Sequence, residues 1–156
     1  AILELSKSKH FKDMEITIVG DGRLFDETLQ PLEKFSNVTI NRGFLSHKEI
    51  SSLHKQFGVF ITPTRMDSQG VSRDEAMSSG LVPITTDITA IPEFVDWESG
   101  ILTPPEDYKA MSKGILELYN NPDKFIQMSR NAAKRVRKQT DSKLIIDAEL
   151  KLIKGD

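Results

Sequence analysis

Two acidic side chains, Asp67 and Glu75, lie on either side of a glycine in the stretch "TPTRMDSQGVSRDEAMSSG". The residues after Gly70 are typical of a short helix, and Gly80 is typical of the residue that ends one. The first N–H groups of a helix have no internal partner and carry partial positive charge, so they can hold a phosphate where the backbone is approachable. Because glycine has no side chain, Gly70 leaves that approach open.

The acids and hydroxyls around this glycine indicate what else a ligand would contain. Ser72 can donate a hydroxyl hydrogen bond, and Glu75, about one turn into the helix, can accept hydrogen bonds from hydroxyl groups. Asp67, in the preceding loop, can accept others. Backbone amides can bind phosphate groups, and the neighbouring carboxylates can bind hydroxyl groups. Together they fit a ligand in which phosphate is linked to sugars. The simpler interpretation is that Asp67, Asp74 and Glu75 only stabilise the helix start, by about 0.3–1 kcal/mol each.

Short apolar runs rich in β-branched residues predict the strands that position this stretch. They are residues 15–22, 37–43, 58–64, 80–87 and 99–105. Helical segments fall between them, and this alternation predicts a three-layer α/β fold with a doubly wound, Rossmann-like parallel sheet. Ligands of such sheets bind at the carboxyl ends of the strands, where the stretch begins. The chain opens with a helix-like segment, "AILELSKSKH", so we expect its first strand to be missing.

Capping residues and apolar spacing predict the helices. Residues 46–49 form a capping box, and Pro31 ends or kinks the helix that starts near Phe25. Residues 107–154 are helical in pattern: Asn121–Pro122 starts one helix, and Asp141 or Ser142 starts the last. We expect the following apolar residues to face the core: Ile50, Leu53, Ala76, Met77, Ala110, Met111, Ile115, Leu118, Leu144, Ile145, Ala148 and Leu152.

Composition limits the classes of protein to which the chain can belong. Its 156 residues predict one domain, residues 1–156. With 28% charged residues and a net charge of −2, nothing indicates a nucleic acid as the main partner. No apolar run approaches the length that spans a bilayer. The absence of cysteine excludes disulfides and thiolate metal sites and is compatible with the cytoplasm, where we expect the protein.

The opening stretch resembles the donor-site signature of retaining glycosyltransferases of family 4, which have two Rossmann-like domains in the arrangement called GT-B. The family pattern is an acid, seven residues, and a glutamate in an "EAMAxGxPVI" context. Here it reads Asp67, seven residues, Glu75, and then "EAMSSGLVPIT". The segments "TIVGDG" before it and "IPEFVDWESGILTPPED" after it also resemble family motifs. The resemblance covers residues 15–119.

The resemblance implies a role for each matching residue. Glu75 would bind the ribose hydroxyls of a nucleotide-sugar, and Asp67 would take the place of a family glutamate that contacts the donor sugar. Backbone groups would bind the rest of the donor. The diphosphate would lie at Gly70, Val71 and Ser72, and the base along the loop Arg42, Gly43, Phe44 and Leu45.

The resemblance also implies what this chain lacks. The family's Arg and Lys, which neutralise the leaving diphosphate, and its acceptor-binding N-terminal domain are absent. We therefore expect the chain to be the C-terminal donor-binding half of a GT-B enzyme, which binds a UDP or GDP type of nucleotide but does not catalyse alone. The intact enzyme would transfer a hexose with retention of anomeric configuration, for example in polysaccharide biosynthesis. We expect neither a metal nor a further cofactor, and an acceptor that is a sugar, a lipid-linked molecule or a protein.

Two other functions stay open. One is a sugar-nucleotide epimerase of the same two-domain architecture. The other is a non-catalytic α/β regulatory domain, for which a phosphoacceptor receiver would use Asp21.

Some conspicuous residues have ordinary interpretations. The three histidines His10, His47 and His54 are expected at the surface or in packing, and the residues Asp96-Trp97-Glu98 in a solvated turn with Trp97 packed. The basic segment 134–138 is expected on a solvated helix face. Its second interpretation is peripheral contact with the inner face of an anionic membrane.

Overall fold

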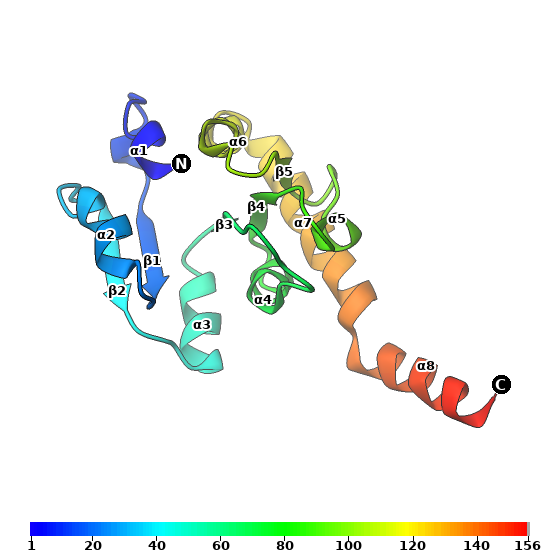
Figure 1. Ribbon diagram of the computed structural model, residues 1–156. Coiled ribbons are helices and arrows are strands. Elements are labelled where there is room, and N and C mark those ends of the chain that lie inside the picture. Colours follow the sequence, from blue (N-terminus) through cyan, green and yellow to red (C-terminus); the bar gives the residue numbers. More distant parts are fainter. Residues whose placement is uncertain (156) are drawn as a thin grey trace.

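The computed structural model, which describes residues 1–155, has the predicted α/β fold with parallel strands (Figure 1). The five strands are β1 (Ile16–Gly20), β2 (Val38–Arg42), β3 (Val59–Thr62), β4 (Val82–Thr86) and β5 (Ile101–Thr103). Every pairing between them is parallel, with Ile16 opposite Val38, Val59 opposite Val82 and Ile84 opposite Ile101. All five strands fall within the apolar runs that the sequence indicates.

The strands form two hydrogen-bonded groups and not one continuous sheet. One group has the order β1–β2 and the other the order β3–β4–β5. In Figure 1, β1 and β3 are the inner strands of the two groups, and within residues 1–155 no ladder joins them. The central strand β4 is buried along its whole length, whereas β1 and β3 are half-buried at every position. The inner side of β1 and of β3 therefore lacks a strand neighbour.

The helices begin and end largely where capping residues predict. They are α1 (Ile2–Leu5), α2 (Phe25–Leu29), α3 (His47–His54), α4 (Val71–Ser78), α5 (Ile91–Phe94), α6 (Tyr108–Asn120), α7 (Pro122–Thr140) and α8 (Ser142–Lys154), with 3-10 turns η1 (Phe11–Asp13) and η2 (Gln30–Leu32). The capping box that precedes α3 is complete, because Ser46 and Glu49 each accept from the other's backbone amide. The Asp141 side chain caps α8. Beyond α4, Gly80 has a φ of +88°, the left-handed conformation of a helix-ending glycine.

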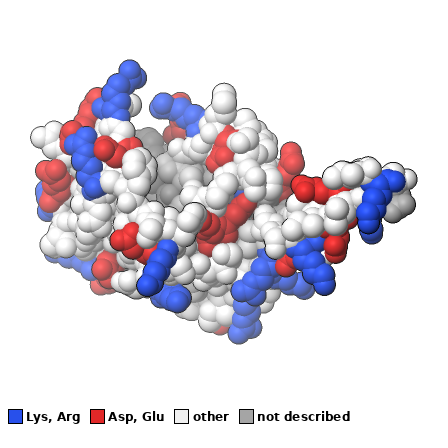
Figure 2. All heavy atoms as spheres, turned by 90° about the horizontal axis from the view of Figure 1, so that it is seen from below, with Lys and Arg blue, Asp and Glu red and all other residues white. Residues whose placement is uncertain are grey.

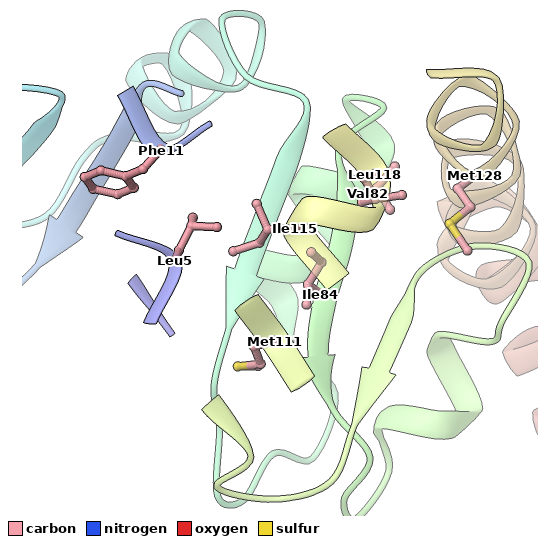
Figure 3. Packing of buried hydrophobic residues seen from close by; sticks show 8 residues of the cluster. All are labelled: Leu5, Phe11, Val82, Ile84, Met111, Ile115, Leu118 and Met128. Carbon is pink, nitrogen blue, oxygen red and sulfur yellow. The ribbon is translucent and has the colours of Figure 1, made fainter. Parts of the chain in front are cut away.

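Two apolar clusters hold the helices on the sheet. The first joins α1, η1, β4, α6 and α7, and Figure 3 shows its eight buried side chains: Leu5, Phe11, Val82, Ile84, Met111, Ile115, Leu118 and Met128. The second joins α4, α5 and α7 through Met77, Ile91, Val95, Ala132 and Val136. Ile101 packs on the first cluster and Leu102 on the second. Since neighbouring strand residues point to opposite faces, the clusters cover opposite faces of the β3–β5 group, which makes three layers.

The prediction that the apolar residues of the last helix face the core is wrong. Leu144, Ile145 and Leu152 are 55%, 44% and 81% exposed, and Ala148 is exposed as well. The chain turns at Asp141, which adopts an extended conformation, and α8 then runs away from the remaining helices (Figure 1). The amphipathic pattern predicts the helix and its apolar face, but it does not specify which other residues pack against that face. Within residues 1–155, no helix combines the length and apolarity that crossing a membrane requires.

The turn at Asp96 is held by polar contacts and not by Trp97, which is 78% exposed. The Asp96 carboxylate accepts a hydrogen bond of 2.7 Å from the Ser99 hydroxyl and pairs with Arg135. Arg135 also donates to the Phe94 carbonyl at 2.7 Å. The basic segment 134–138 is therefore only partly a solvated face. Basic and acidic residues are interspersed on the side of the molecule that Figure 2 shows.

Candidate functional site

Gly70, the N-cap of helix α4 (Val71–Ser78), lies eight residues beyond the carboxyl end of β3. Gly70 has a φ of +82° and caps the helix without a side chain. A Cβ atom at this position would lie 2.8 Å from Nη1 of Arg73 and 3.1 Å from Oδ2 of Asp67. The turn therefore requires glycine both for its dihedral angle and for space. The helix start remains accessible, since Val71 and Ser72 are exposed.

A buried ion pair fixes the turn from inside. Arg73 is 1% exposed and donates to the Asp74 carboxylate from Nη2 at 2.8 Å and from Nε at 3.2 Å. It also donates to the Gln69 carbonyl, and its guanidinium lies 4.9 Å from the centre of the Phe94 ring. Asp74 is thus the partner of a buried cation and not merely an acid that stabilises a helix start. Sequence reasoning missed this pair; the signal is an arginine followed directly by an acid in a short helix that also carries the apolar residues Ala76 and Met77.

Asp67 lies beside the helix start, because its Oδ2 is one of the atoms that a Gly70 side chain would meet. Its backbone is held by Thr89, in the loop after β4. The Asp67 amide donates to the Thr89 hydroxyl at 3.3 Å, and that hydroxyl donates to the Asp67 carbonyl at 2.5 Å. Thr89 has a φ of +49°, which is uncommon for a residue other than glycine. The loops after two neighbouring strands thus meet at Asp67.

Glu75 lies one turn into α4 and faces α3. Its Oε1 is 2.9 Å from Nδ1 of His47, and its side chain is 31% exposed. His54, at the other end of α3, is buried and lies with its ring edge toward Phe60. Burial lowers the pKa of His54 below its ordinary value of 6.5, and the Glu75 charge acts in the opposite direction. Glu75 therefore lies against the face of α3 that carries both histidines, a relation that sequence reasoning did not predict.

His47, which contacts Glu75 of α4, lies two residues after the loop 42–45. Within this loop, Gly43 has a φ of +133° and donates to the Gly20 carbonyl at 2.9 Å. Phe44 is 88% exposed, so its ring is free to meet a planar group. The Arg42 side chain points elsewhere and donates to Asp21 at 3.0 Å and to Asp26 at 3.1 Å. Asp21, which a receiver would need as its phosphoacceptor, is thus bound to an arginine.

The carboxyl ends of the strands also border a cavity of about 460 Å³. It is lined by Ala1, Pro63, Thr64, Arg65, Thr86, Glu106, Asp107, Tyr108 and Met111. Asp67, Gly70 and Glu75 are not part of its wall, and all three are half-buried residues outside it. Among residues 1–155, no group of three or more His, Asp or Glu side chains could hold a metal ion.

Comparison with protein families gives a match over most of the chain. The model of the family described as "Glycosyl transferases group 1" matches residues 1–121. The capsular polysaccharide biosynthesis glycosyltransferase CapM of Staphylococcus aureus is 30% identical over 138 residues, which are 86% of this chain and 36% of CapM. The alpha-D-kanosaminyltransferase of Streptomyces kanamyceticus is 27% identical over 130 residues, 78% of this chain and 32% of that enzyme. The chain thus spans about a third of the length of these curated relatives.

Solved structures of glycosyltransferases share the fold. A TarM variant from S. aureus, in complex with UDP among other ligands, aligns over 97% of this chain and 31% of its own, with a TM-score of 0.80 and 20% identity. The catalytic domain of cholesterol-alpha-glucosyltransferase from Helicobacter pylori aligns over 89% of this chain and 87% of its own, with a TM-score of 0.76 and 23% identity.

Proposed function

The chain belongs to the group 1 glycosyl transferases, and we propose that it is the part of such an enzyme that binds a nucleotide-sugar donor. The observation that carries the proposal is the start of α4. There Gly70 opens a helix at the carboxyl edge of the strands, with Asp67 on one side and Glu75 on the other. Accessible helix amides bind phosphate and carboxylates accept from sugar hydroxyls, so the edge has groups for both parts of such a donor.

The roles within this site follow the chemistry of each group. Glu75 accepts from the ribose, Asp67 from the donor sugar, and the amides that follow Gly70 bind the diphosphate. The exposed Phe44 ring and the backbone of its loop border the base, since this loop ends two residues before His47, which contacts Glu75. UDP is the first nucleotide to test, because the TarM variant above was crystallised with it.

In the intact enzyme, we propose, transfer proceeds with retention of anomeric configuration through stabilisation of the departing nucleoside diphosphate, without a protein nucleophile or a metal. Basic side chains that neutralise this leaving group, and a domain that binds the acceptor, would come from outside residues 1–156. Charge compensation on the leaving group and a positioned acceptor are both needed for turnover. The chain should therefore bind the nucleotide without catalysing transfer.

Thermal unfolding with UDP, GDP or ADP tests donor binding. A ligand at 100 times its dissociation constant stabilises the folded state by about 2.7 kcal/mol. For a domain of this size, that raises the melting temperature by about 5–10 °C. One diphosphate should give this shift, and Glu75→Ala should reduce it. If none of the three stabilises the chain at millimolar concentration, the proposal is wrong.

A further inference from the structure

The contact between His47 and Glu75 assigns a role to a histidine that the sequence interpretation left as a surface residue. We propose that His47 is a positioning residue that holds the Glu75 carboxylate ready for the ribose of the donor. The inference rests on the proposed function, because it takes Glu75 as the group that binds the ribose.

The geometry allows Glu75 to be held and still to accept from a ligand. A carboxylate only accepts hydrogen bonds, so the 2.9 Å contact requires His47 to carry a proton on Nδ1. This bond uses Oε1 and leaves Oε2 for a hydroxyl group. The Glu75 side chain is 31% exposed and makes no other hydrogen bond within residues 1–155, so without His47 no polar contact would fix its rotamer.

His47 can hold Glu75 because its own backbone is fixed. It is the first residue of α3, between the two members of the capping box, Ser46 and Glu49. In that box Ser46 donates from its amide to Glu49 Oε2 at 2.8 Å and from its hydroxyl to the same oxygen at 2.6 Å. Seven residues on and therefore on the same face of the helix, His54 is buried beside Phe60. Both ends of α3 are thus anchored, and His47 presents its imidazole from a fixed point.

We expect the contact to affect ligand binding more than the stability of the fold. The His47 side chain is 91% exposed, and exposed ion pairs contribute little to stability. Ordering a flexible side chain during binding weakens affinity by about two- to tenfold. A Glu75 that is already ordered avoids this loss, but only for ligands whose hydroxyl groups it contacts. His47 should therefore affect the discrimination between a ribose and a deoxyribose.

The experiment compares UDP with 2′-deoxy-UDP and 3′-deoxy-UDP, using calorimetry on the whole chain. His47→Leu removes the donor, whereas His47→Asn keeps an amide N–H near the position of Nδ1. Lys48→Leu is the matched control, since Lys48 is also exposed in the first turn of α3. We expect the preference for UDP to fall about two- to tenfold in His47→Leu and to stay near the wild-type value in His47→Asn and Lys48→Leu.

The possible failures are distinguishable. If the wild type prefers UDP and His47→Leu keeps the full preference, or loses affinity equally for all three nucleotides, His47 does not position Glu75. A wild type that binds all three nucleotides equally overturns the assignment of Glu75 to the ribose and this inference with it. If UDP, GDP and ADP all fail to bind to the wild type, the proposed function itself is overturned.

Discussion

Replacing Arg73 by methionine should strongly destabilise the chain, because it leaves the charge of Asp74 buried without a partner. The two side chains are 2% and 10% exposed, and two hydrogen bonds of 2.8 and 3.2 Å join them. Removing one member of a buried ion pair costs about 3–5 kcal/mol. At about 2–4 °C per kcal/mol for a domain of this size, the melting temperature should fall by about 6–20 °C.

Urea and thermal denaturation measure this loss, with Arg130→Met as the control because Arg130 is exposed. The double variant Arg73→Met with Asp74→Leu should be more stable than Arg73→Met alone, since it buries no unpaired charge. The reasoning is refuted if Arg73→Met unfolds at the same urea concentration as Arg130→Met, or if the double variant loses the sum of the two single losses. Arg73→Met should also weaken UDP binding, because it removes the hydrogen bond from Arg73 to the Gln69 carbonyl, which shapes the turn.

Three further changes follow from local geometry. Gly70→Ala should lower the free energy of unfolding by about 1–3 kcal/mol in urea denaturation, because of the positive φ and the contact with Arg73; an unchanged midpoint would contradict this. Ser46→Ala should cost about 1 kcal/mol by the same method, and Ser46→Thr should not. Because burial lowers the pKa of His54, the unfolded chain takes up its proton at higher pH than the folded one. Stability should therefore fall as the pH drops through about 6.5, and His54→Phe should flatten this dependence; an equal slope in both proteins would exclude His54 as its source.

Features that depend on a few neighbouring residues could be predicted from the sequence. The capping box at Ser46, the glycine that ends α4 and the proline that starts α7 act through their own turn of the helix, and the structure has all three. The strands were predictable for the same reason, since buried parallel strands are short and continuously apolar.

Features that depend on distant parts of the chain were not predictable. His47 and Glu75 are 28 positions apart, and only the tertiary fold brings them together. The apolar face of α8 predicts burial, yet after the turn at Asp141 this face is exposed in the part of the chain that the structure describes. Among the described residues, no ladder joins β1 to β3, and the residues of these strands carry no signal for this, because apolarity does not specify a neighbour. The ligand roles of Asp67 and Glu75 stay predictions that the binding experiments test.

The division of the strands has a consequence for handling the purified chain. In a continuous five-stranded sheet, only the two outer strands have an edge without a hydrogen-bonded neighbour. Within residues 1–155, the four strands β1, β2, β3 and β5 each have such an edge. Unpaired N–H and C=O groups on an edge are a template for strands of other molecules. The residues of β1 (ITIVG) and β3 (VFIT) include no charge that would oppose such pairing. The chain should therefore self-associate as its concentration rises, and a fused strand that pairs with both inner edges should keep it monomeric.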